Sequence, residues 1–153
     1  MYIINHELYF PPVETAEETG LLAVGGDLST QRLILAYKSG IFPWFNEEDP
    51  ICWWSPDPRF VLYPEELKIS KSMQSLIRKN KFEFTVNKAF DAVIQNCKNV
   101  FREGQPGTWI TNDMVQAYIK LHQQGYAHSA EAWSNGKLVG GLYGIKLGGI
   151  FFG

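Results

Sequence analysis

The stretch GIFPWFNEEDPICWWSPDPR, residues 40–59, holds three of the five tryptophans of the chain, and several prolines divide it into short pieces. A proline fixes φ and removes a backbone hydrogen-bond donor, so this stretch cannot form a long helix. It is predicted to be a stiff segment of loop and strand that presents flat aromatic faces. Such faces bind nucleobases by stacking, although tryptophans more often fill a hydrophobic core.

Trp53 and Trp54 are adjacent in this stretch. Successive side chains of a strand point to opposite faces of the sheet. The two indoles therefore cannot line one pocket, and one of them is expected to belong to the core.

The composition bounds the class of protein. Of the 153 residues, 45% are hydrophobic and 20% are charged, which is typical of a soluble globular domain with at most a small appendage. No apolar run is long enough to cross a bilayer, and the first residues lack a signal-peptide pattern. Cys52 and Cys97 form no metal-ligand spacing with each other or with the histidines, so no metal is expected. Two free thiols indicate a reduced, cytoplasmic protein.

A local excess of positive charge follows the aromatic stretch. Residues 68–81 contain no acidic residue and five basic ones, Lys68, Lys71, Arg78, Lys79 and Lys81. Such a run can meet phosphate groups of a nucleic acid. The charge pattern alone favours the simpler alternative, a solvated helix face.

Apolar spacing predicts four helices in the chain. They are expected to begin after Ser29, Ser70, Asn87 and Thr111, which are residue types that cap helices with a side-chain oxygen. The first helix is expected to run through Ser39. Residues 1–28 are expected to be irregular.

Alternating or short apolar runs predict five strands, at residues 60–63, 82–86, 127–133, 137–145 and 150–152. Asn135 and Gly136 separate two of these runs, which is a strong hairpin signal. The last apolar strand has no following partner, and natural domains cover an open apolar sheet edge. The sequence is therefore expected to be an incomplete domain, cut at Gly153.

Seven stretches, in the same order, resemble the bacterial leucyl/phenylalanyl-tRNA–protein transferases. They extend over nearly the whole chain, and the combination is very specific. The stretches are GLLAVGGDLS (20–29), AYKSGIFPWF (36–45), WWSPDPR (53–59), GTWI (107–110), AY (117–118), HSAEAW (128–133) and LVGGLYGIKLG (138–148).

The resemblance implies an α/β (α+β) fold. It implies a small N-terminal domain at residues 1–62 and a GNAT-like (N-acetyltransferase-like) domain at residues 63–153, incomplete at its C-terminal end. It also implies an aminoacyltransferase that moves Leu, Phe or sometimes Met from aminoacyl-tRNA to acceptor proteins with N-terminal Arg or Lys. The product is marked for N-end rule degradation. A cytoplasmic monomer with no cofactor and no membrane partner is expected.

The resemblance also assigns site residues. Trp44 and Trp109 are implied to stack on the terminal adenosine of the tRNA, with Tyr37 and Tyr118 beside them. A core position is the alternative for each of these side chains. The basic residues Arg78, Lys79 and Lys81 are expected to contact the tRNA backbone.

One predicted strand places Ser129 and Glu131 on the same face. Ser129 is expected to contact substrate. Glu131 is the candidate catalytic residue of this chain, as a proton acceptor or as a partner for the cationic acceptor, and an exposed carboxylate on a sheet is the alternative. The family continues past the equivalent of Gly153, and its main catalytic residues are expected there.

The implied reaction is aminolysis of an ester that is already activated. It needs no nucleotide hydrolysis, and the sequence contains no P-loop, dinucleotide-binding or HExxH motif. Two other functions remain open from the residues. One is a GNAT acetyltransferase that uses acetyl-CoA, although no Q/R-x-x-G-x-G/A loop is visible. The other is a non-enzymatic nucleic-acid-binding module built on the tryptophans.

Overall fold

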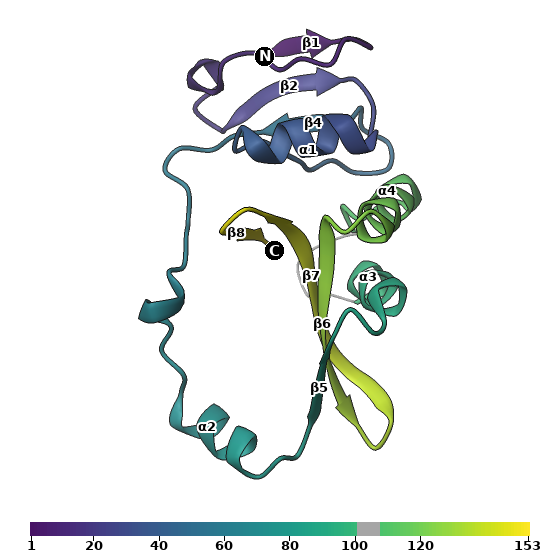
Figure 1. Ribbon diagram of the computed structural model, residues 1–153. Coiled ribbons are helices and arrows are strands. Elements are labelled where there is room, and N and C mark those ends of the chain that lie inside the picture. Colours follow the sequence, from purple (N-terminus) through teal and green to yellow (C-terminus); the bar gives the residue numbers. More distant parts are fainter. Residues whose placement is uncertain (101–107) are drawn as a thin grey trace.

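The computed structural model describes residues 1–100 and 108–153 and contains two four-stranded sheets (Figure 1). The first sheet uses strands from residues 2–54, and the second uses strands from residues 83–152. Helices pack on both sheets, which confirms the mixed α/β class. The division of domains at residues 62 and 63 stays a prediction.

The N-terminal sheet has the order β1-β2-β4-β3. Its strands are β1 (Tyr2–Ile4), β2 (Leu21–Gly25), β3 (Phe42–Pro43) and β4 (Cys52–Trp54), and α1 (Thr30–Lys38) follows β2. β1 runs parallel to β2, and the other pairs are antiparallel. The expectation that residues 1–28 are irregular is wrong, because two of these strands and a short 3-10 helix (Val13–Thr15) lie there.

Trp53 is the central core residue of this sheet. Its side chain is fully buried, its indole N–H donates to the carbonyl of Gly25 at 2.9 Å, and Phe10 packs edge-on at 4.8 Å between ring centroids. Trp54 points the other way and donates to the carbonyl of Trp44 at 2.7 Å. The prediction that one of the two indoles is a core residue is confirmed.

The C-terminal sheet is antiparallel, with the order β5-β6-β7-β8. Its strands are β5 (Glu83–Val86), β6 (Ala127–Ser134), β7 (Lys137–Leu147) and β8 (Ile150–Phe152). Helices α3 (Phe90–Asn99) and α4 (Asn112–Gln123) cover one face of this sheet (Figure 1). Asn135 and Gly136 have φ values of 49° and 73° and form the predicted two-residue hairpin turn.

Three of the four predicted helix caps are confirmed. Ser29, Ser70 and Thr111 each accept a hydrogen bond from the backbone amide three residues later. The prediction for Asn87 is wrong, because the residue before α3 is Ala89, which has no capping side chain. Asn87 has φ 58°, and its side-chain oxygen instead accepts from the amide of Ser129 at 3.0 Å.

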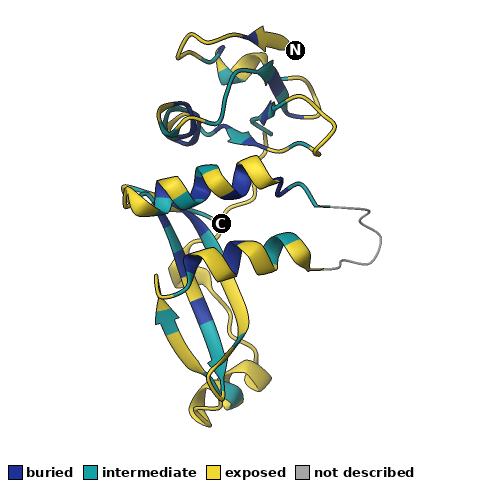
Figure 2. Ribbon diagram, turned by 90° about the vertical axis from the view of Figure 1, so that its right-hand side faces the viewer, coloured by how far each residue is buried: buried dark blue, intermediate teal, exposed yellow. Residues whose placement is uncertain are grey.

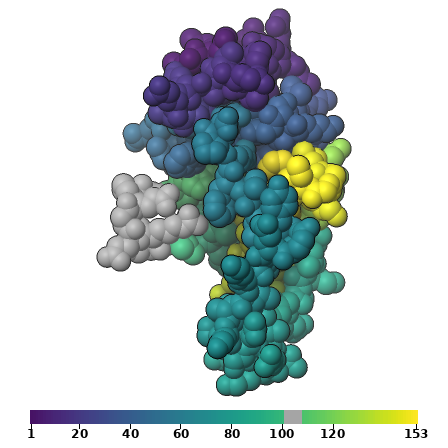
Figure 3. Space-filling model, turned by 90° about the vertical axis from the view of Figure 1, so that its left-hand side faces the viewer, coloured from purple at the N-terminus to yellow at the C-terminus, as the bar shows by residue number. Residues whose placement is uncertain are grey.

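Residues 59–82, called the arm below, connect the two sheets and contain α2 (Lys71–Arg78). The prediction of a strand at 60–63 is wrong: these residues form no strand, and a 3-10 helix (Pro64–Glu66) follows. No residue of α2 is buried, and Figure 3 shows the arm, in teal, running down the surface of the molecule. Its exposed apolar side chains are Phe60, Val61, Leu62, Tyr63, Leu67, Ile69, Met73 and Ile77.

The core continues from the N-terminal sheet into the C-terminal one. Buried side chains of α1 and α4 belong to one cluster, and the ring of Tyr37 lies 5.2 Å from that of Phe152. Figure 2 shows buried residues concentrated where the helices face the sheets, while the arm is exposed. This junction fixes residues of both sheets around one cavity. Among the described residues, no helix is long and apolar enough to span a bilayer.

Candidate functional site

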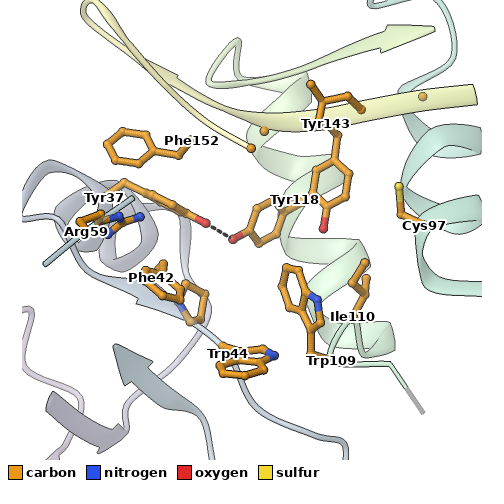
Figure 4. A pocket seen from close by; sticks show the side chains of 15 residues that line it. Tyr37, Phe42, Trp44, Arg59, Cys97, Trp109, Ile110, Tyr118, Tyr143 and Phe152 are labelled. Atoms are coloured by element: carbon orange, nitrogen blue, oxygen red, sulfur yellow. Dashed lines mark hydrogen bonds between the residues drawn. The ribbon is translucent and has the colours of Figure 1, made fainter. Parts of the chain in front are cut away.

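A pocket of about 610 Å³ opens at the junction of the two sheets (Figure 4). This volume lies in the usual range for small-molecule sites, roughly 300–1,000 Å³. Residues from α1, β3, α4, β7 and β8 contribute to its walls, and seven of the fifteen lining residues are aromatic. The lining residues are Tyr37, Phe42, Pro43, Trp44, Arg59, Cys97, Trp109, Ile110, Tyr118, Gly141, Leu142, Tyr143, Gly144, Phe152 and Gly153.

Trp44 and Trp109 both present their indoles to this pocket (Figure 4). Trp44 directly follows β3, where its amide donates to the carbonyl of Cys52 at 3.0 Å, and its side chain is 48% exposed. Trp109 is half-buried and precedes the capped start of α4, with the buried Ile110 beside it. Trp44 thus presents much of its indole to solvent, whereas Trp109 is partly buried and packs against the core cluster. Stacking on a ligand stays a prediction for both tryptophans.

Tyr37 and Tyr118 meet across the junction. Their hydroxyl groups share a hydrogen bond, and both side chains are buried (Figure 4). Burial raises the pKa of Tyr37 to about 12. Burial and the neighbouring Tyr37 hydroxyl raise the pKa of Tyr118 well above its ordinary value. Both phenols are therefore neutral at physiological pH, and they offer hydrogen bonds rather than a base. Tyr37 thus belongs to the core and also lines the pocket, and its contact with substrate stays a prediction.

The glycines of the LVGGLYG stretch form part of the pocket wall. A Cβ atom on Gly141 would lie 2.8 Å from the side chain of Val93 on α3, which is too close for any real side chain. The backbone of β7 therefore approaches α3 closely at this point. Close packing between strand and helix explains why a glycine stands at this position.

Glu131 and Ser129 lie on one strand face, as predicted, but neither lines the pocket. Each is only 1% exposed. The Glu131 carboxylate accepts bonds from the hydroxyls of Ser129 and Thr85, both at 2.5 Å, and from the amides of Lys88 at 3.4 Å and Ala89 at 3.3 Å. This position argues against the predicted roles of Glu131 as proton acceptor and of Ser129 as substrate contact.

The Glu131 carboxylate instead binds the two backbone amides that directly precede α3, where no side chain of the N-cap residue forms a cap. Burial raises the pKa of Glu131, but the four hydrogen bonds outweigh it and hold the pKa below its usual value. A carboxylate near a helix N-terminus also gains from the helix dipole. Trp133 extends the network, because its indole N–H donates to the Thr85 hydroxyl at 2.8 Å.

The predicted tRNA-backbone residues Arg78, Lys79 and Lys81 lie at the end of α2 and beyond it. All three are exposed, and among the described residues none of them forms an ion pair. None of these three cations lines the pocket, and Figure 1 shows α2 far from α1. Their place agrees with contact to a distant part of a large ligand and equally with a solvated surface.

Several pocket residues were not among the site residues predicted from the sequence. Phe42, Tyr143 and Phe152 come from three different strands, and only the packing of the two sheets brings them together. Cys97 is half-buried and reaches the pocket wall. Gly107 of the GTWI stretch lies outside the described residues. Among the residues that are described, no cluster of His, Cys, Asp and Glu has the makings of a metal site.

Comparisons of this chain with family models and with known proteins all identify the same family. Residues 61–153 match the family described as leucyl/phenylalanyl-tRNA protein transferase, and residues 26–57 match the N-terminal domain of the same family. A leucyl/phenylalanyl-tRNA–protein transferase of Flavobacterium johnsoniae is 59% identical over 153 residues, which is 100% of this chain and 72% of that protein.

Two further relatives carry the same name. The protein of Syntrophobacter fumaroxidans is 56% identical over the whole chain, which covers 65% of its length. That of Syntrophotalea carbinolica is 57% identical, with 66% of its length covered. The chain thus spans about two thirds of the length of the curated relatives it matches.

Proposed function

The chain belongs to the leucyl/phenylalanyl-tRNA–protein transferase family, and from this we propose that the whole protein transfers Leu, Phe or Met from aminoacyl-tRNA to proteins that begin with Arg or Lys. The observation that carries the proposal is the aromatic pocket. It gathers Tyr37, Trp44, Trp109 and Tyr118 at one junction, and these are the residues that the family resemblance selects.

The pocket chemistry supports binding of an aminoacyl-adenosine. The partly exposed indoles of Trp44 and Trp109 offer flat faces for a purine, and base stacking contributes roughly 1–3 kcal/mol per base. The apolar wall around Phe42 and Phe152 suits the side chain of Leu or Phe. The neutral hydroxyls of Tyr37 and Tyr118 supply hydrogen bonds without adding charge.

The reaction proposed is aminolysis of the ester that links the amino acid to the terminal ribose. The α-amine of the acceptor forms a bond to the carbonyl carbon, the bond from that carbon to the ribose 3′-oxygen breaks, and a proton passes from the amine to that oxygen. An α-amine has a pKa of about 7.7–8.0, so a useful fraction is neutral near pH 7. Positioning of the two substrates is then the main requirement.

The finer features of this function are part of the same proposal. They are a GNAT-like C-terminal domain, a monomeric cytoplasmic enzyme without a cofactor, and an N-end rule degradation signal as the product. The hydrogen bonds that the Glu131 carboxylate accepts occupy its oxygens, and they hold its pKa below the usual value. Both effects make this carboxylate a poor proton acceptor. We therefore propose that other groups of the whole protein remove the proton.

A transfer assay tests the function. The full chain, as its gene encodes it, is mixed with radiolabelled leucyl- or phenylalanyl-tRNA and a peptide that begins with Arg, without ATP. We expect labelled peptide, and a matched peptide that begins with Gly should remain unlabelled. Acetylation of the peptide from acetyl-CoA would identify an acetyltransferase instead. Binding of tRNA with no transfer to any peptide would identify a nucleic-acid-binding module.

Removal of either pocket indole is expected to weaken ligand binding while the fold persists. Trp44→Ala and Trp109→Ala should each reduce the affinity for puromycin, an aminoacyl-adenosine mimic, by roughly 1–3 kcal/mol, the range for a lost stacking contact. Calorimetry measures the affinity, and circular dichroism checks the fold. Phe60→Ala is the matched control, because its ring is 96% exposed and lies outside the pocket. Unchanged affinity in both tryptophan variants would contradict the stacking role.

The basic residues of the arm are expected to act through tRNA phosphates. Reversing the charge of Arg78 and Lys79 should flatten the dependence of log Kd on log salt concentration for whole tRNA, by roughly one unit of slope per lost contact. Lys137→Glu is the control, since Lys137 is an exposed base on the β6–β7 hairpin. An identical slope in wild type and the double variant would show that Arg78 and Lys79 are solvated surface residues that do not contact tRNA phosphates.

A further inference from the structure

Among the described residues, Arg59 is the one charged side chain that lines the pocket. It ends the aromatic stretch, two residues after Asp57, at the point where the arm begins. The other lining residues are aromatic, aliphatic, glycine, proline or cysteine. A cation in such a wall favours a ligand group of negative charge beside it.

The guanidinium group is held in place by the pocket itself. Its Nη1 atom donates to the carbonyl of Gly40 at 2.8 Å, and Gly40 directly follows the last turn of α1. Its Cζ atom lies 4.7 Å from the ring centroid of Phe42 and 5.9 Å from that of Phe152. Figure 4 shows Arg59 beside Tyr37, on the wall away from Trp109. Stacking and one hydrogen bond thus orient the group without neutralising it.

The positive charge of Arg59 has no acidic counterpart in the described part of the chain. No carboxylate there lies within ion-pair distance of its nitrogens. A guanidinium carries five N–H donors, and the Gly40 carbonyl engages one nitrogen. The remaining donors are available to a ligand, and their planar fork matches the oxygens of a phosphate.

The substrates of the proposed function differ in charge, and only one of them fits Arg59. The acceptor has a cationic Arg or Lys side chain, which the guanidinium would repel. The amino acid carried by tRNA is an ester, so its carboxyl group is neutral. The negative charge nearest to the reacting ester is the phosphate on the 5′ side of the terminal adenosine.

We propose that Arg59 forms an anion subsite at the pocket rim that binds the 5′-phosphate of the terminal aminoacyl-adenosine. This inference rests on the proposed function, because it places the adenosine on the indoles of Trp44 and Trp109. The phosphate is then gripped at the opposite wall, and the two contacts together fix the ester between them. Arg59 acts as a binding and positioning residue and takes no part in proton transfer.

A ligand-and-variant cycle tests this assignment. Calorimetry on the full chain measures the dissociation constants of puromycin, which has a free 5′-hydroxyl group, and of puromycin 5′-monophosphate. In the wild type, the phosphate should tighten binding roughly tenfold, as one charge-assisted hydrogen-bonded contact does. Arg59→Gln should reduce this ratio to about one while puromycin itself binds within about twofold of its wild-type affinity. Arg59→Lys should retain part of the ratio, because it keeps the charge and loses the fork.

Lys137→Gln is the control, because Lys137 is an exposed base on β7 outside the pocket, and it should keep the wild-type ratio. An equal ratio in wild type and Arg59→Gln would overturn the subsite. If Arg59→Gln weakens the binding of puromycin and of its 5′-monophosphate equally, Arg59 only shapes the pocket wall, and the anion subsite is again overturned. If wild type binds puromycin and its phosphate equally, the subsite fails and the proposed function stands. If it binds neither, the proposed function fails, and the subsite with it.

Discussion

Glu131→Ala is expected to lower the free energy of unfolding by about 2–5 kcal/mol. The substitution removes the acceptor of four hydrogen bonds from a site that is 1% exposed. The hydroxyls of Ser129 and Thr85 can rotate toward other partners. The amides of Lys88 and Ala89 cannot, and each buried donor left unpaired costs about 1–3 kcal/mol. Urea unfolding followed by circular dichroism measures the loss.

The same carboxylate makes stability depend on pH. Because the pKa of Glu131 in the folded protein is held below its usual value, its contribution is complete above the unfolded pKa of about 4.3. The contribution is lost as the pH falls through the lower, folded pKa. Glu131→Gln should therefore be less stable than wild type at pH 7, and this difference should shrink as the pH falls below about 4.

Glu83→Gln is the control for both Glu131 variants, since Glu83 is an exposed carboxylate on β5 of the same sheet. It should change stability by less than about 0.5 kcal/mol, as surface substitutions do. If Glu131 instead had the catalytic role predicted from the sequence, its substitution would affect leucine transfer rather than stability. If Glu131→Gln keeps wild-type stability at every pH while leucine transfer falls to background, Glu131 belongs to the reaction after all.

The α3 cap shows where prediction from the sequence stops. Ser29, Ser70 and Thr111 were predictable because each caps an amide three residues away, within one local pattern. At the N-terminus of α3, the amide of Ala89 instead donates to Glu131, which lies 42 residues away in the chain and reaches it only through the β5–β6 pairing. No local residue spacing indicates such a long-range contact, and the sequence pattern therefore predicted Asn87 as the N-cap of this helix.

The wrong strand at residues 60–63 has a different cause. The run FVLY has high intrinsic strand propensity, yet a strand also needs a neighbour to pair with. In the described part of the chain, no strand pairs with these residues, and Phe60 is 96% exposed.

The aromatic pocket was predictable only in part. The resemblance selected its four central side chains, whereas Arg59, Phe42 and Phe152 gain their positions from the packing of two sheets.

Arg32→Ala is expected to cost about 3–5 kcal/mol, the range for removing one member of a buried charged network. The Arg32 guanidinium is 1% exposed. It donates to the carbonyls of Asn5 at 2.9 Å, Glu7 at 3.0 Å and Tyr9 at 3.5 Å, and it pairs with Asp27 at 3.3 Å. One side chain of α1 thus holds the segment that follows β1. Urea unfolding followed by tryptophan fluorescence measures the change.

Asp27→Asn separates the contribution of the Arg32–Asp27 ion pair from that of the hydrogen bonds between Arg32 and the backbone carbonyls. The Asp27 side chain is 42% exposed, so its ion pair with Arg32 is screened by water and should contribute less than about 1 kcal/mol. A loss in Asp27→Asn as large as that in Arg32→Ala would show that the ion pair, rather than the three carbonyls, holds the segment. If the carbonyl contacts dominate, Arg32→Ala should also release Phe10 from Trp53, which it meets at 4.8 Å. Trp53 pairs with Pro43 beside Trp44, so puromycin affinity should then fall together with stability.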